Sequence, residues 1–241
     1  MRPYLYAAVL LASLLVVAAC TDDESIEPSD IVSTIPWPDN ERAEYVLFER
    51  DDLETEFGRG VLTITRQRGQ FELRLHFEGG GDTDESVIIV DATTLKPATV
   101  RREVGREGTT VTGEYKPEEE IVDVVITDED GDIRTIPIRL EESYYDNESS
   151  LFIWRSIPFE EGFKGSYQSV QTNQGQLVPV TLEVTGRQEI SVPAGTFETW
   201  RVEIRIGGTK QVAWYADTPQ RELVQYDNSR LIFQLTAIDG G

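Results

Sequence analysis

Hydrophobic and polar residues alternate along most of the chain after position 40. The clearest case is residues 71–77 (FELRLHF), in which every second residue is apolar. A period of two is typical of a β-strand that buries one face. The same alternation, or a short apolar run, recurs in residues 44–48, 61–66, 87–90, 122–126, 133–140, 177–184, 200–206, 211–215, 222–226 and 231–238.

Turn signals separate these segments. They are Arg68-Gly69, Asp130-Gly131, Gly207-Gly208 and Asp227-Asn228, which are typical of tight turns. Short connections favour antiparallel pairing, so we predict an all-β fold of roughly a dozen or more strands. One short helix is predicted near residues 147–156, with N-cap residues at Asp146-Asn147 and an end before Pro158.

Two parts of this pattern resemble each other. Residues 60–91 match residues 186–217 at eight of 32 positions when the second segment is offset by 126. The alternation slips by one residue, because Phe71 is in phase with the strand that follows it and Phe197 is not. A one-residue slip turns every side chain to the other face unless a bulge absorbs it. Two explanations account for the match. One is a duplication that produced two similar halves, and the other is that both segments use the same residues to form hairpin turns.

The first twenty residues follow a different pattern. An apolar run from Leu5 to Ala19 follows a single charge at Arg2. The run is short for a permanent transmembrane helix, so residues 1–19 are predicted to be an export signal. It ends in Val17-Ala18-Ala19-Cys20, which resembles the lipobox of bacterial lipoproteins. The resemblance implies cleavage before Cys20 and anchoring to a membrane through lipid on its thiol. An ordinary signal peptide or membrane anchor that happens to contain Cys20 is the alternative.

Residues 20–40 differ from both neighbours. Positions 21–40 hold six acidic residues and three prolines without a periodic apolar pattern, which predicts a solvated, lipid-anchored acidic tether. Twenty extended residues would hold the rest of the protein several nanometres from the membrane. Trp37 is either the point where the tether meets the body or an exposed side chain. Residues 41–241 are predicted to form a single β-rich domain.

Composition excludes several classes of function. The chain has 44 acidic and 22 basic residues and a net charge of −22, whereas proteins that bind nucleic acid need a basic face. One Cys cannot form an internal disulfide, and one His excludes multi-His metal sites. We therefore expect no nucleic-acid partner, no metal site and no cofactor.

No sequence motif for catalysis is present. The chain lacks GxSxG and P-loop motifs, and its glycines do not form a dinucleotide-binding turn. His76 lies on the charged side of its strand, which predicts a solvated surface residue. Residues 128–132 (DEDGD) resemble a calcium loop superficially, but their Gly stands fourth rather than sixth, so we predict a hairpin turn. We expect no catalytic residues.

Aromatic residues are the remaining candidates for binding. Trp154, Trp214 and Tyr215 are the candidate ligand-binding residues, because large aromatic side chains can line a cleft. Packing in the core is the alternative. Trp214 and Tyr215 are adjacent and face opposite sides of a strand, so at least one lies outside the core unless both faces are covered.

Four stretches resemble a known family in sequence and order. They are residues 91–97 (DATTLKP), 145–158 (YDNESSLFIWRSIP), 192–200 (VPAGTFETW), and 213–217 (AWYAD) followed by 221–224. Together they resemble the exported bacterial proteins of domain-of-unknown-function family 3108. The resemblance implies an extracytoplasmic β-rich domain and supplies no catalytic residues. By looser analogy with periplasmic lipoprotein carriers, we expect a large, strongly curved antiparallel sheet or an open or half barrel.

These observations predict a non-enzymatic, lipid-anchored protein of the cell envelope. Its expected partners are the membrane, through the lipid on Cys20, and either a hydrophobic ligand or an envelope protein. A carboxylate-based hydrolase would need two acids in one cleft, and a structural docking module would offer an exposed apolar patch or a free sheet edge. The shape of the sheet separates these hypotheses, because a ligand carrier needs an open, apolar concavity.

Overall fold

The computed structural model describes residues 26–106 and 108–240, and within them the chain forms one sheet of 15 strands. The predicted signal peptide and Cys20 lie outside the described residues. The first strands along the chain are β1 (Asn40–Glu49), β2 (Asp52–Gln67), β3 (Gln70–Gly79), β4 (Asp82–Asp91), β5 (Pro97–Val104), β6 (Thr109–Lys116), β7 (Ile121–Thr127) and β8 (Ile133–Arg139), with a 3₁₀ turn (η1, Pro117–Glu119) before β7. The second set is β9 (Tyr144–Asp146), β10 (Lys164–Gln171), β11 (Gln176–Val192), β12 (Gly195–Ile206), β13 (Thr209–Ala216), β14 (Leu223–Asp227) and β15 (Leu231–Asp239).

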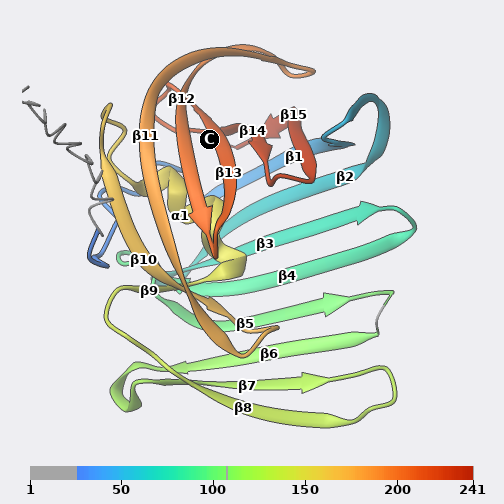
Figure 1. The fold of residues 1–241 in the computed structure, drawn as a ribbon, viewed down its shortest axis with the longest axis vertical. Coiled ribbons are helices and arrows are strands. Elements are labelled where there is room, and N and C mark those ends of the chain that lie inside the picture. Colours follow the sequence, from blue (N-terminus) through green and yellow to red (C-terminus); the bar gives the residue numbers. More distant parts are fainter. Residues whose placement is uncertain (1–25, 107, 241) are drawn as a thin grey trace, which may run out of the picture.

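Two meanders meet at the centre of this sheet, where β1 pairs with β15. From β1 the sheet continues strand by strand to β8, and from β15 it continues back to β9. All neighbours are antiparallel except β9 and β10. The two edge strands, β8 and β9, follow one another in the sequence, and the sheet curls without closing into a barrel (Figure 1). The predicted fold, a strongly curved antiparallel sheet or half barrel, is confirmed.

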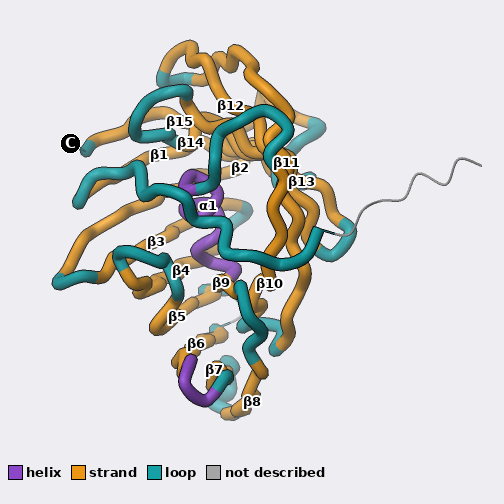
Figure 2. The backbone as a smooth tube through the Cα atoms, turned by 90° about the vertical axis from the view of Figure 1, so that its left-hand side faces the viewer, coloured by secondary structure: helices purple, strands orange, loops and turns teal. Residues whose placement is uncertain are grey.

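A short helical segment fills the concave side of the sheet. It runs through η2 (Asn147–Ser149), α1 (Ser150–Ile153) and η3 (Trp154–Ser156), and the ribbon places it inside the curve of the strands (Figures 1 and 2). Asp146 caps its start, because its carboxylate accepts a hydrogen bond from the backbone N–H of Glu148 at 2.8 Å. The helix and the N-cap predicted from the sequence are both confirmed.

The sheet surrounds the helical segment, so apolar side chains on several sides of the segment are buried. Phe152, Ile153, Trp154 and Ile157 are each at most 1% exposed. They belong to one continuous hydrophobic cluster with the inward-facing residues of the strands. The concave side of the sheet is therefore a packed core.

One charged residue of this segment is also buried. Arg155 forms a bidentate ion pair with Glu41 of β1, with N–O distances of 2.6 and 3.0 Å, and both side chains are at most 6% exposed. The same guanidinium donates to the carbonyl of Gln220 at 2.7 Å. Such a pair costs desolvation and is stable only when well paired. It ties the helical segment to the centre of the sheet.

Residues 29–37, which we call the strap, lie against the body. The backbone N–H of Ser29 donates to the carbonyl of Ser166 at 2.9 Å, and that of Ser33 donates to the carbonyl of Ser156 at 2.8 Å. Ile31 and Trp37 are 3% and 6% exposed. The prediction of a solvated tether is wrong for the strap, because these two apolar side chains belong to the main hydrophobic core. Trp37 is buried against the body, and the chain already meets the body at Ser29.

A second, smaller cluster lies outside the main core. It consists of Ile190, Ala216 and Val224, with partly buried residues such as Trp214 and Phe197 packed against it. The long hairpin of β11 and β12 reaches β15, where the backbone N–H of Ala194 donates to the carbonyl of Leu235 at 3.0 Å. This outer cluster therefore covers part of the convex face.

The two similar sequence segments share a strand pattern but differ in register. Residues 60–91 and 186–217 each run through three consecutive antiparallel strands. Phe71 is 2% exposed in the main core, whereas Phe197, its counterpart, packs partly against the outer cluster. The slip in alternation seen in the sequence is present in the structure.

The packed interior predicts a large loss of stability when its filling is reduced. Phe152→Ala removes a ring that is 1% exposed, and should lower the free energy of unfolding by about 3–5 kcal/mol. The exposed Ile133 (69%) supplies the control, since Ile133→Ala should change stability by less than about 0.5 kcal/mol. Urea denaturation followed by Trp fluorescence measures both. Equal losses for the two variants would contradict a packed concave core.

Candidate functional site

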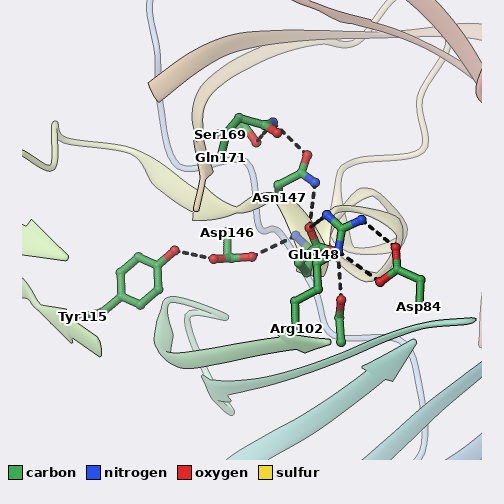
Figure 3. A network of polar contacts seen from close by, with 9 residues as sticks. Asp84, Arg102, Tyr115, Asp146, Asn147, Glu148, Ser169 and Gln171 are labelled. Atoms are coloured by element: carbon green, nitrogen blue, oxygen red, sulfur yellow. Dashed lines mark hydrogen bonds and ion pairs between the residues drawn. The ribbon is translucent and has the colours of Figure 1, made fainter. Parts of the chain in front are cut away.

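A polar network lies on the concave side of the sheet, beside the apolar core. It joins strands β4, β5 and β6 to the start of the helical segment and to β10 (Figure 3). We call it the inner polar network; its members are Asp84, Ser86, Arg102, Tyr115, Asp146, Asn147, Glu148, Ser169 and Gln171. These nine polar side chains are linked to one another in one place, and they are the first candidate for a functional site.

Arg102 is the cation of this network. Its guanidinium donates to both carboxylate oxygens of Asp84, at 3.0 and 2.5 Å, and to Glu148 at 3.2 Å. Glu148 also accepts from the hydroxyl of Ser86 at 3.0 Å. The side chains of Arg102, Asp84 and Glu148 are 12–31% exposed. One guanidinium therefore holds two carboxylates, one from the sheet and one from the helical segment.

Asp146 is the buried member of the network, with no exposed surface. One of its oxygens accepts from the hydroxyl of Tyr115 at 2.5 Å, and the other accepts from the N–H of Glu148. Burial, with the nearby charge of Glu148, raises the pKa of Asp146 to about 7, although its two hydrogen bonds and Arg102 oppose that rise. Burial and the Asp146 carboxylate raise the pKa of Tyr115 as well. Asp146 therefore gains and loses a proton near neutral pH.

The geometry of the network favours a structural role. Paired carboxylates in a hydrolase face a substrate across a cleft, whereas Asp146 is covered completely, and Asp84 and Glu148 both bind Arg102. The hydrogen bonds of the network join the start of the helical segment to β4, β5, β6 and β10, or join neighbouring strand residues to one another. Among the described residues, no group of three or more His, Cys, Asp or Glu side chains is arranged to hold a metal ion.

The sequence analysis missed this network. Strands β5 and β6, which carry Arg102 and Tyr115, have a weaker apolar alternation than their neighbours. One signal was present in the sequence: Ser86 is separated by two and four positions from the buried Ile88 and Val90, so it faces the same side of the strand. A polar residue at an inward position of a strand indicates a polar partner inside the fold.

The three aromatic candidates do not share a cleft. Trp154 is 1% exposed and donates to the hydroxyl of Tyr167 at 3.0 Å. Tyr215 is fully buried and donates to the carbonyl of Leu151 at 2.9 Å. Trp214 packs against the outer cluster instead, where its indole donates to Gln188 at 3.0 Å. The alternative of core packing holds for Trp154 and Tyr215. In β13, Tyr215 faces the main core and Trp214 packs against the outer cluster on the other face.

Two further expectations are confirmed. His76 lies on the outer side of β3, with its imidazole 3.0 Å from Glu78 and its side chain 35% exposed. The carboxylate of Asp128 accepts from the backbone N–H groups of Asp130 and Asp132 at 3.2 and 2.9 Å. These bonds order the hairpin turn between β7 and β8.

A groove of about 650 Å³ lies on the outer side of strands β3 to β7. Its lining includes the half-buried apolar side chains of Val87, Ile89 and Val125. The ion pairs Arg74–Glu85 and Arg101–Glu103 also lie along it. We call it the outer groove. The continuous apolar run of residues 87–90 was its signal in the sequence, because such a run places apolar side chains on both faces of a strand.

The curled sheet with a helix in its concavity defines a β-barrel-like protein. The sequence profile of one family, "Protein of unknown function (DUF3108)", matches residues 44–230. The chain belongs to this family, so the resemblance seen in its four sequence stretches is confirmed. No curated protein sequence matches the chain.

Solved structures share the fold at low sequence identity. A β-barrel-like protein of domain of unknown function DUF1849 from Brucella abortus is 10% identical, with a TM-score of 0.50 over 84% of this chain and 98% of the other. A putative exported protein with a YmcC-like fold from Bacteroides fragilis is 12% identical, with a TM-score of 0.32 over 86% of this chain and 99% of the other. The first of these similarities shows the fold alone.

The helices of the described residues are too short or too polar to cross a membrane.

The raised pKa of Asp146 predicts a pH dependence of stability. The folded state keeps this proton up to a pH of about 7, whereas an unfolded Asp loses it near pH 4. The contribution is therefore fully favourable below pH 4 and is lost as the pH rises to 7. Asp146→Asn should remove this term, which amounts to at most about 1.4 kcal/mol per pH unit.

Urea denaturation between pH 4 and pH 8 measures this term. Glu129→Gln, in the exposed turn after β7, is the matched control and should keep the slope of the original protein. Identical slopes for the original protein and Asp146→Asn would show that Asp146 does not keep its proton in the folded state.

Proposed function

We propose that this protein is a non-enzymatic, lipid-anchored component of the cell envelope that binds another envelope protein on its outer surface. One observation carries the proposal: the concave side of the sheet is filled by the protein's own helical segment. The sequence left two kinds of partner open, a hydrophobic ligand and an envelope protein. The packing of the interior favours the second.

A carrier of acyl chains needs free apolar volume inside its sheet. Here Phe152, Ile153 and Trp154 occupy that position, and each is at most 1% exposed. A hydrophobic ligand would have to displace the helical segment, which the Arg155–Glu41 ion pair ties to β1. Displacement would separate Arg155 from Glu41 and leave the Glu41 carboxylate in β1 without its partner, which is strongly unfavourable.

The outer groove provides a surface suited to a protein partner. Apolar side chains at the centre of an interface, surrounded by charged residues, match the usual anatomy of a protein-binding patch. Val87, Ile89 and Val125 provide the apolar part, and the ion pairs of Arg74 and Arg101 provide the charged part. This surface stays free when the concave side is filled.

The membrane anchor rests on the sequence around Cys20. Two or more acyl chains hold a protein stably at a membrane, since each buried methylene contributes about 0.8 kcal/mol. The net charge of −22 opposes binding to anionic headgroups. The lipid rather than the protein surface therefore provides the attachment.

Native mass spectrometry of the mature protein, purified from membranes, tests the anchor and the absence of a bound hydrophobic ligand together. The expected mass is that of a chain beginning at Cys20 with two or three acyl chains and no additional non-covalent ligand. Cys20→Ala should lack the acyl mass and leave the membrane fraction, whereas Ile133→Ala should behave like the original protein. An unacylated Cys20 contradicts the anchor, and a stoichiometric lipid that dissociates on denaturation contradicts the choice of partner.

Photo-crosslinking in cells tests the outer groove. A photoreactive amino acid in place of Ile89 should yield a discrete protein adduct, because Ile89 lines the groove. The same substitution at Arg205, an exposed position of β12 outside the groove, is the control and should yield none. The proposal of a protein partner at the groove fails when neither position crosslinks or both crosslink to the same extent.

A further inference from the structure

We propose that the strap favours one orientation of the protein at the membrane, with the strap end of the sheet toward the lipid bilayer. The strap end is the end of the sheet where Ser29 and Asp30 contact the body. This inference deepens the proposed function and rests on the lipid at Cys20. In this orientation the strap end of the protein faces the lipid surface.

The strap is held at its beginning by several contacts. Ser29 is hydrogen bonded to Ser166 of β10 at 2.9 Å. Asp30 forms an ion pair with Lys96 at 2.6 Å. Ile31 is 3% exposed and belongs to the main core. The chain is therefore attached to the folded body from about Ser29 onward.

The later part of the strap leads into the centre of the sheet. The backbone and hydroxyl groups of Ser33 both donate to the carbonyl of Ser156, at 2.8 and 2.7 Å. Trp37 packs edge-on against Phe71, with 5.9 Å between ring centroids, and the guanidinium of Arg155 lies 5.4 Å from the Trp37 ring. The chain then enters β1, the partner of β15. The strap thus lies on the body along its whole length.

The chain between the lipid and the strap is short. Cys20 precedes Ser29 by nine positions, and each residue spans at most about 3.6 Å. The lipid-bearing residue can therefore be at most about 32 Å from Ser29, and only if the chain between them is fully extended. The twenty-residue tether expected from the sequence would allow more than twice this reach, so the structure brings the body much closer to the bilayer.

The strap end and the opposite end of the sheet are well separated. Asp30 contacts Lys96, which lies in the connection between β4 and β5. Strand β4 runs from Asp91, near Lys96, to Asp82 at the other end of the sheet, nine positions away, or about 30 Å along a strand.

Near the strap end, Lys96 lies over the ring of Tyr144, and Tyr144 stacks on Tyr115 at the end of β6. Because β7 begins beside this end of β6, the turn that follows β7 lies at the opposite end of the sheet (Figure 1). This turn holds Asp130. The chain from Ser29 to Cys20 reaches the opposite end only when it is almost fully extended, so most of its conformations leave the lipid nearer to the strap end.

Fluorescence energy transfer from the protein to the membrane tests this orientation. The sequence contains no cysteine besides Cys20, so an introduced cysteine is the single free thiol of the acylated protein. Lys164→Cys places a donor at the strap end, two positions from Ser166, and Asp130→Cys places one at the opposite end. Both original side chains are exposed. The full acylated chain is inserted into phosphatidylcholine vesicles that carry an acceptor on lipid headgroups.

We expect a greater loss of donor fluorescence at position 164 than at position 130. Insertion of twenty Gly and Ser residues between Glu24 and Ser25 should abolish this difference, because the longer chain no longer restricts the body. Equal transfer at the two positions, or a difference that survives the insertion, would overturn the inference. An intact mass without acyl chains would instead overturn the lipid anchor, so the two failures are distinguishable.

Discussion

The concave face of a curled, half-apolar sheet has to be covered, and this requirement governs the rest of the structure. A sheet of this size cannot leave its inner face in water without losing the hydrophobic stabilisation that holds it together. The chain meets the requirement with its own segment from Asn147 to Ile157, which is too short to be stable as an isolated helix. The sheet and the segment therefore depend on each other: the sheet buries the helix, and the helix provides the core of the sheet.

Polar contacts fix where this filling lies. The Arg155–Glu41 ion pair attaches the end of the segment to β1, at the middle of the sheet, and the inner polar network attaches its beginning to β4, β5 and β6. The strap then covers Ser156 and completes the core with Ile31 and Trp37. Buried polar groups need specific partners, so these contacts select one position for an otherwise apolar element.

This arrangement bears directly on function. Because the protein's own helical segment fills the interior, the outer surface is the place where a partner can bind. There the apolar residues of the outer groove lie among ion pairs. The strap contributes to the core and is bound to the body from Ser29 onward. A lipid at Cys20, as proposed above, would therefore be joined to the body by a short segment, and the outer groove would remain accessible.

The sequence by itself determined the local elements, and the tertiary structure decided what covers them. Alternation and turn residues identified most strands, and Asp146 and Pro158 bounded the helix, because these signals act between near neighbours in the chain. Neither the inner polar network nor the outer groove was predicted from the sequence as a site, although the apolar run 87–90 supplies two residues of the groove. The pairing of β1 with β15, the burial of the strap and the network around Arg102 required contacts between distant segments. A period of two shows which side chains share a face of a strand, but not whether that face meets water, a helix or another hairpin; for this reason Trp154 and Tyr215 lie in the core and Trp214 in the outer cluster.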